Sequence, residues 1–189
     1  MTRLAGAALL ALLALGHPAS AEETPRIMPT RDVDVIYRIA GPNGLLEQRL
    51  RWGVSLGKLR VDPPTPGLFV VIDIASHVVQ AVREGDHSVV ITDSGNQAMP
   101  GVAPSGTFAR KGRDKVAGLD CVLWDTKDTT GRIITACLTA DGVLLRAEAD
   151  GLVLVEATDV RFVPQSEAVF RIPADYKKIM PDPVSRQAP

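Results

Sequence analysis

Between residues 33 and 162 the sequence is a succession of short apolar segments separated by turns that contain Gly, Pro, Asn or Asp. Many of the segments alternate apolar and polar side chains, as in Val33-Asp34-Val35-Ile36-Tyr37, and this alternation is typical of β-strands. No stretch keeps the spacing of an amphipathic helix. The sequence therefore predicts a mainly β fold with little helix, a meander of nine or ten strands forming a curved antiparallel sheet or half-barrel.

Two Asp-Gly pairs, at 141–142 and 150–151, are the clearest hairpin turns in the sequence. A strict two-residue turn at 150–151 would place Glu156 beside the apolar Leu145, so we expect a β-bulge or a shifted register there. Further expectations are a long loop at 93–107 and one helical turn at 165–169. The expected strands are 33–40, 45–52, 58–61, 68–74, 78–82, 88–92, 119–126, 132–139 and 152–162, with another apolar run between the two Asp-Gly pairs.

The first 21 residues have the features of a secretory signal peptide. Arg3 supplies a positive charge, residues 4–16 are apolar or small, and Ala19-Ser20-Ala21 forms a small-x-small cleavage site. We expect cleavage after Ala21 and a periplasmic protein, although a retained membrane anchor is the alternative. The remaining chain then divides into an N-terminal arm at 22–31, a single β-rich domain at 32–179 and a disordered Pro-rich tail at 180–189.

Two cysteines, Cys121 and Cys137, are the only ones in the chain. An exported protein meets an oxidising environment, so a disulfide is the default expectation. If the turn at 127–131 centres on Thr129, the two cysteines face each other directly across neighbouring strands, and Trp124 lies on the opposite face, which we expect to be the core. A redox or metal role is the alternative, but the sequence has no CxxC spacing.

The net charge is −1 and the hydrophobic content 46%, so neither nucleic-acid binding nor intrinsic disorder is favoured. The densest basic run contains Arg110, Lys111, Arg113 and Lys115. Two interpretations stay open for it: contact with the phosphates of anionic lipid headgroups, or an ordinary solvated loop that leads into a strand.

Three motifs in the second half of the chain carry a family resemblance: 115–121 (KVAGLDC), 141–145 (DGVLL) after Cys137, and 170–176 (FRIPADY). In this order they resemble uncharacterised exported bacterial proteins of the LolA/LolB-like lipoprotein-carrier superfamily. The resemblance implies a curved antiparallel sheet around an apolar cavity. Carriers of the LolA type have helices on the concave side, starting with a long N-terminal one, whereas only ten residues separate Ala21 from the first expected strand here. The resemblance therefore implies the fold more than it implies lipoprotein carriage.

A cavity in such a sheet would be lined by apolar side chains from several strands, although a core filled by side chains is equally expected for a small barrel. The candidate cavity residues are Trp52, Leu68, Val70, Ile72, Trp124, Ile134, Leu138 and Leu154.

No catalytic residue, metal site or cofactor is predicted. Ser76 beside His77 lacks a GxSxG elbow, and Asp73, His77, Asp86 and His87 lack an HExxH-type spacing, so a hydrolase or a metal site is the weakest hypothesis. The leading hypothesis is a non-enzymatic periplasmic protein that binds a lipid or a lipoprotein in an apolar cleft. The alternative is a cell-envelope structural or interaction protein with a filled core, a protein partner and no small-molecule ligand.

Overall fold

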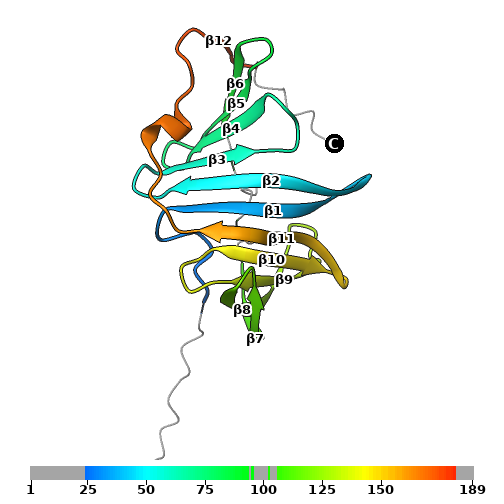
Figure 1. Ribbon diagram of the computed structural model, residues 1–189. Coiled ribbons are helices and arrows are strands. Elements are labelled where there is room, and N and C mark those ends of the chain that lie inside the picture. Colours follow the sequence, from blue (N-terminus) through cyan, green and yellow to red (C-terminus); the bar gives the residue numbers. More distant parts are fainter. Residues whose placement is uncertain (1–23, 94, 96–101, 103–105, 182–189) are drawn as a thin grey trace, which may run out of the picture.

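Twelve strands form a single sheet in a computed structural model that describes residues 24–93, 95, 102 and 106–181 (Figure 1). The strands are β1 (Val33–Gly41), β2 (Gly44–Gly53), β3 (Lys58–Asp62), β4 (Leu68–Asp73), β5 (Val78–Arg83), β6 (Ser88–Asp93), β7 (Ala109–Val116), β8 (Leu119–Lys127), β9 (Ile133–Leu138), β10 (Leu144–Ala149), β11 (Leu152–Arg161) and β12 (Lys177–Ile179). One 3₁₀ turn, η1 (Glu167–Phe170), precedes β12. The expected mainly β fold with little helix is confirmed, and the described part of the chain has no helix long and apolar enough to cross a bilayer.

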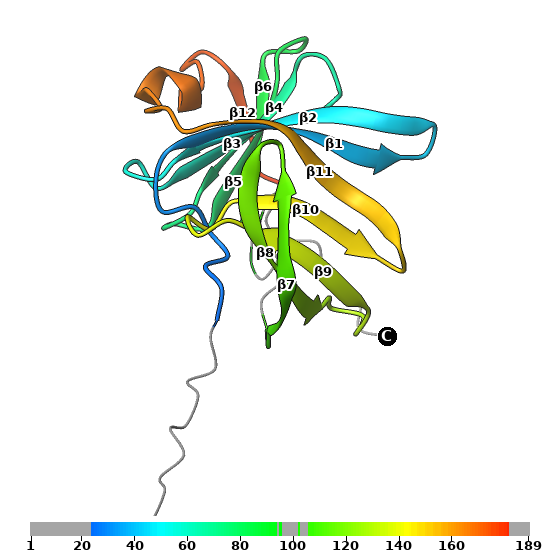
Figure 2. The same ribbon diagram turned by 60° about the horizontal axis from the view of Figure 1, so that its bottom comes forward.

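The strand order is β12-β6-β5-β4-β3-β2-β1-β11-β10-β9-β8-β7. Two meanders, β1 to β6 and β7 to β11, therefore meet where β1 pairs with β11. All pairs are antiparallel except β12 with β6. Figures 1 and 2 show β12 and β7 at opposite ends of the sheet, which is curved but open, so these strands do not close into a barrel. The expected signal peptide, the end of the Pro-rich tail and most of the 93–107 loop lie outside the described residues.

The β10–β11 hairpin confirms the predicted turn and the predicted β-bulge. Asp150 and Gly151 both have positive φ, 53° and 76°, as a two-residue type I′ turn requires. The register then shifts after Ala147, so that Glu156 lies opposite Arg146 instead of the apolar Leu145. The bulge thus keeps a carboxylate beside a guanidinium.

Two strands, β7 and β12, are missing from the sequence prediction. β7 contains the basic run that we interpreted as a loop, because its polar composition hides the strand. It pairs with β8 through a tight turn in which Ala117 and Gly118 both have positive φ. β12 is three residues long. Its pairing with β6 begins at Lys177, whose amide donates a hydrogen bond to the His87 carbonyl at 2.8 Å.

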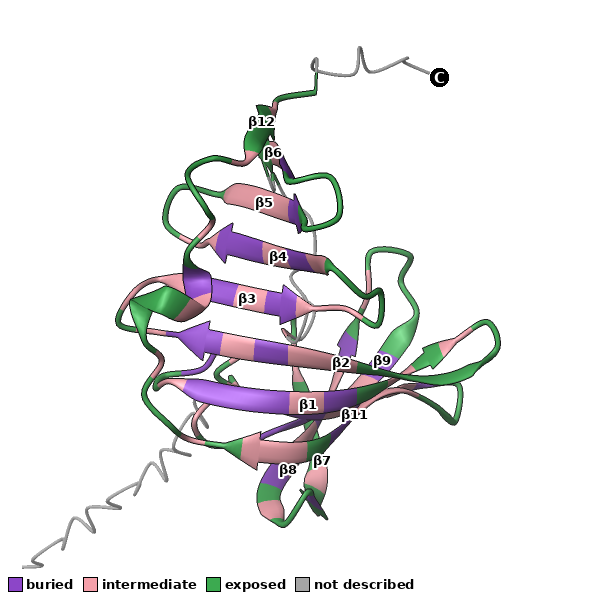
Figure 3. Cartoon of the chain, turned by 45° about the horizontal axis from the view of Figure 1, so that its top comes forward, coloured by how far each residue is buried: buried purple, intermediate pink, exposed green. Residues whose placement is uncertain are grey.

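Three clusters of buried apolar side chains hold the sheet together. Burial alternates along β3 (Figure 3), as expected for a strand with one fully covered face, whereas β2 is exposed at its start and buried at its end. The main cluster contains Tyr37 and Trp52, a second surrounds Trp124, and a third packs Phe170 of η1 against Phe69 of β4. The C-terminal segment thereby covers the second face of β4.

The Cys121–Cys137 disulfide is present, with the two Cα atoms 5.5 Å apart. The expected register is wrong by two residues, because Cys137 lies opposite Leu123 and the bond runs diagonally between β8 and β9. A shift of two keeps every side chain on its expected face. However, both faces are covered: the cysteines join the main cluster and Trp124 the second, so the Trp124 face is not the only core.

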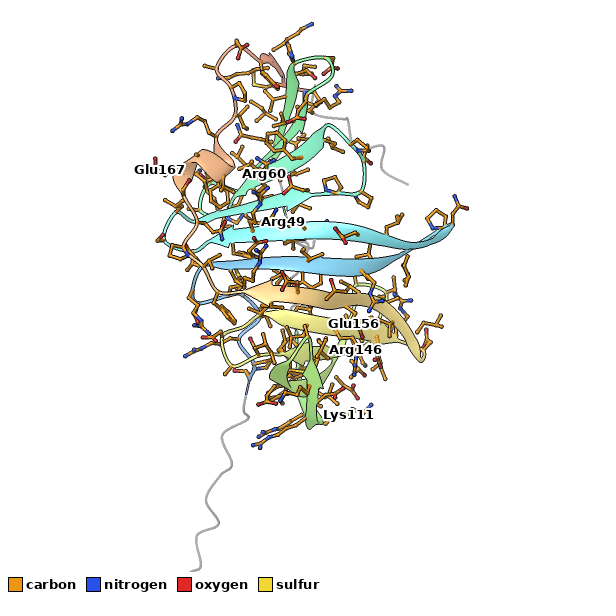
Figure 4. The ribbon with its side chains drawn as sticks, in the orientation of Figure 1. Arg49, Arg60, Lys111, Arg146, Glu156 and Glu167 are labelled. Atoms are coloured by element: carbon orange, nitrogen blue, oxygen red, sulfur yellow. A yellow bond between two sulfur atoms is a disulfide. The ribbon has the colours of Figure 1, made fainter. Side chains whose placement is uncertain are left out.

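The outer face of the central strands carries a network of ion pairs. Asp34 is 5% exposed and accepts hydrogen bonds from Arg49 at 2.8 and 2.5 Å and from Arg161 at 3.1 Å. Burial raises the pKa of the Asp34 carboxyl, but the guanidinium groups of Arg49 and Arg161 outweigh it and lower the pKa overall. In a second group of ion pairs, Arg146 of β10 reaches Glu156 of β11 at 3.9 Å (Figure 4), and Glu156 also pairs with Arg38 of β1 at 3.2 Å.

Candidate functional site

A cleft of about 630 Å³ lies between the N-terminal segment and strands β7 to β9. One wall is the segment Thr24-Pro25-Arg26, and the other is formed by β7 and β8. The volume falls within the range of small-molecule binding sites in proteins. The lining residues are Thr24, Pro25, Arg26, Arg113, Asp114, Asp120, Cys121, Val122, Trp124, Leu138, Thr139 and Ala140.

The register of the strands explains how the cleft is built. Arg113 on β7 lies opposite Val122 on β8, and Val122 lies opposite Leu138 on β9. Directly opposed residues of an antiparallel pair share one face of the sheet, so these three side chains form a row. Trp124 lies on the same face two residues along β8 from Val122. The floor of the cleft is therefore apolar, and β7 adds a cationic margin.

The N-terminal segment is fixed against the β9–β10 turn. The Thr30 amide donates a hydrogen bond to the Asp141 carbonyl at 2.9 Å, and Arg31 forms an ion pair with the Asp141 carboxylate at 2.9 Å. The Met28 carbonyl oxygen lies so close to Gly142 that a Cβ there would be 2.1 Å from it. The close approach requires glycine, and it positions the wall of the cleft.

Both carboxylates at the cleft have a cationic neighbour. Asp114 pairs with Arg146, and its pKa is lowered by the Lys115 backbone amide and by the Arg146 guanidinium. Asp120 lies 3.8 Å from the Lys115 ammonium group. By contrast, Arg26 and Arg113 form no ion pair with any residue that the structure describes. The cleft thus has an apolar floor and two cations at its margin.

The eight candidate cavity residues do not form one lining. Trp52, Val70 and Ile72 belong to the main cluster, while Leu68 is half-buried outside all three clusters. The other four, Trp124, Ile134, Leu138 and Leu154, belong to the second cluster. Of the eight, Trp124 and Leu138 line the cleft.

Sequence reasoning missed the Thr24–Arg26 wall and the row that starts at Arg113. The row depends on recognising β7 as a strand, and its basic sequence gives no apolar alternation that would reveal it. The wall depends on the close packing of Met28 on Gly142, for which the sequence offers only the glycine.

The weakest hypothesis, a metal or hydrolytic site around His77, receives no support from the positions of its residues. His77 and His87 lie in turns at opposite ends of the six-residue strand β5, about 20 Å apart along it. The Asp73 carboxylate, at the end of β4, accepts a hydrogen bond from the Ser76 amide at 3.0 Å and pairs with Lys58, so it stabilises the turn that follows β4. Within residues 24–93 and 106–181, no group of three His, Cys, Asp or Glu side chains is arranged to hold a metal ion.

No protein-family model and no curated protein sequence matches this chain. Solved structures do match its fold. An uncharacterized conserved protein from Thermus thermophilus has a TM-score of 0.60 at 16% identity, over 80% of this chain and 91% of that one. MucB has a TM-score of 0.52 at 12% identity, and the match covers 80% of this chain and 61% of MucB. PNGF-II has a TM-score of 0.50 at 12% identity, over 82% of this chain and 31% of PNGF-II.

At such low identity these matches show the fold alone. The match to MucB supports a resemblance in fold and does not establish a family. The disulfide between Cys121 and Cys137 is in keeping with an exported protein.

Proposed function

We propose that this is a non-enzymatic periplasmic protein, released by cleavage after Ala21, that binds a lipid or a lipid-modified ligand in the cleft beside β8. The observation that carries the proposal is the apolar floor of a cleft of about 630 Å³, formed by Val122, Trp124 and Leu138. Each methylene group of an acyl chain that leaves water for such a surface contributes about 0.8 kcal/mol. Binding of this kind requires no nucleophile, metal or cofactor.

The two tryptophans allow a direct test. Both are buried, but Trp124 borders the cleft, whereas Trp52 lies in the main cluster and does not line it. In a Trp52→Phe background, dibromostearate bound in the cleft should quench Trp124 fluorescence, because bromine quenches indole only at short range. A Val122→Glu change places a carboxylate on the floor and should abolish the quenching. Val153→Glu, on a half-exposed valine of β11 away from the cleft, is the matched control.

Folding of each variant is checked by circular dichroism, so that loss of binding is separated from loss of structure. Mass spectrometry of organic extracts from the wild-type protein, purified from its own periplasm, gives independent evidence of a bound lipid. The proposal fails if Trp124 is not quenched and the extracts contain no lipid in stoichiometric amount.

The alternative function, an envelope interaction protein, is favoured by one observation. β7 is an eight-residue edge strand, exposed along most of its length, and among the described strands only β8 pairs with it. Such an edge can accept an extended peptide as an additional strand. The bulge after Arg110 and the basic side chains also protect edges against unspecific pairing. Crosslinking in the native envelope through a photoreactive residue at Lys111 would reveal such a partner.

A further inference from the structure

We propose that the ligand of the cleft is an anionic amphiphile, whose charged head is bound by Arg113 and Arg26 while its apolar chain lies on Val122, Trp124 and Leu138. The inference rests on the proposed function and names the class of ligand for the same site. Its basis is the juxtaposition of an apolar floor with two cations that lack a carboxylate partner among the described residues.

The cations stand at the margin of the floor because of the strand register. Arg113 shares one face of the sheet with Val122, and Lys115 on the same face of β7 lies opposite Asp120. Arg110 also shares this face, opposite Trp124, and has an interaction of its own. Positive charge therefore runs along β7, parallel to the apolar side chains of β8. The N-terminal segment contributes Arg26 from the other side of the cleft.

In the part of the chain that the structure describes, the carboxylates that line the cleft pair with cations other than Arg113 and Arg26. The two that line the cleft, Asp114 and Asp120, have cationic neighbours in Arg146 and Lys115. An anionic headgroup would therefore gain ion pairs at the margin, whereas a cationic headgroup would face Arg26 and Arg113 directly. Phosphate and carboxylate heads both satisfy the guanidinium donors, which present several N–H groups in a plane.

The test compares three brominated single-chain amphiphiles of equal chain length by quenching of Trp124 in the Trp52→Phe background. The stearate carries a negative head, the monoglyceride an uncharged head and the alkyltrimethylammonium a positive head. Dibromostearate is expected to bind about tenfold more tightly than the monoglyceride, and the cationic probe most weakly, because two ion pairs at a partly exposed margin together give up to about that factor. The preference should shrink in high salt, which screens exposed charges.

Arg113→Glu should remove the preference for the anionic probe over the monoglyceride. Arg83→Glu makes the same change of charge at a half-exposed arginine of β5, far from the cleft, and should alter none of the three affinities. A repeat with a phosphate monoester of the same chain separates phosphate from carboxylate recognition.

Equal affinities for the three probes, or an Arg113→Glu variant that keeps the anionic preference, would overturn the charge assignment and leave the apolar cleft in place. Failure of every probe to quench Trp124 would remove the assignment of the headgroup, and together with lipid-free extracts it would also remove the proposed function.

Discussion

Removal of the disulfide should destabilise the protein by about 3 kcal/mol. The bond closes a loop between residues separated by 16 positions. In the chain-entropy model a loop of this size restricts the unfolded chain by about 10 cal/mol/K, which is about 3 kcal/mol at 25 °C. For a domain of this size the melting temperature should fall by about 6–12 °C. Both cysteines are buried, so Cys121→Ala with Cys137→Ala adds the cost of two small voids, about 1 kcal/mol.

Urea unfolding followed by circular dichroism measures the effect, with reduced wild-type protein as the control that keeps both sulfur atoms. Because the open unfolded chain exposes more surface, the slope of the unfolding free energy against urea should also rise in the reduced protein. A reduced protein whose unfolding free energy stays within about 0.5 kcal/mol of the oxidised one would refute the loop argument.

Two further changes test the packing of the cleft wall and the ion pairs of the outer face. Gly142→Ala forces a Cβ against the Met28 carbonyl and should expose the N-terminal segment to proteolysis. Gly131 also has positive φ but open space around it, so Gly131→Ala should cost only about 1–2 kcal/mol of backbone strain. Equal rates of proteolysis in the two variants would contradict the contact between Gly142 and Met28. Asp34→Asn should destabilise the protein by about 1–3 kcal/mol at pH 7. The loss is smaller than that from breaking a fully buried ion pair, because Arg49 stays partly solvated. Since the folded-state pKa of Asp34 is lowered, its contribution is complete above the unfolded value of 3.8 and is lost as the pH falls through the folded-state pKa. The difference in unfolding free energy between wild type and Asp34→Asn should therefore shrink as the pH falls below 3.8 in urea unfolding, and a constant difference would contradict this.

Local pattern was enough to predict most of the sheet. Alternation, apolar runs and turn residues identified β1 to β6 and β8 to β11, and the clash between Glu156 and Leu145 in a strict turn predicted the bulge that the structure contains. These features depend on neighbours in sequence or on one hairpin, so the residues themselves carry the information.

The cleft, in contrast, depends on contacts between distant segments. Residues 24–26 reach β7 to β9 only because Thr30 and Arg31 bind Asp141, more than a hundred residues away in the chain. β7 is a strand because β8 offers it a partner, although its own composition disfavours one. Neither effect leaves a periodic signal in the sequence. For this reason only two of the predicted cavity residues, Trp124 and Leu138, line the cleft.

The seam between β1 and β11 has a consequence for biogenesis. Asp34 lies opposite Arg161, so a chain that leaves the ribosome or the translocon from its N-terminus can complete the first meander long before the strand that covers β1 exists. At typical synthesis rates of about 5–20 residues per second the delay is on the order of ten seconds. During that interval β1 is a nine-residue edge strand without its β11 partner, and Val33 and Val35 lack the packing that the second meander supplies. An unpaired edge of this kind is prone to aggregation, so we expect a chaperone to bind the chain during export.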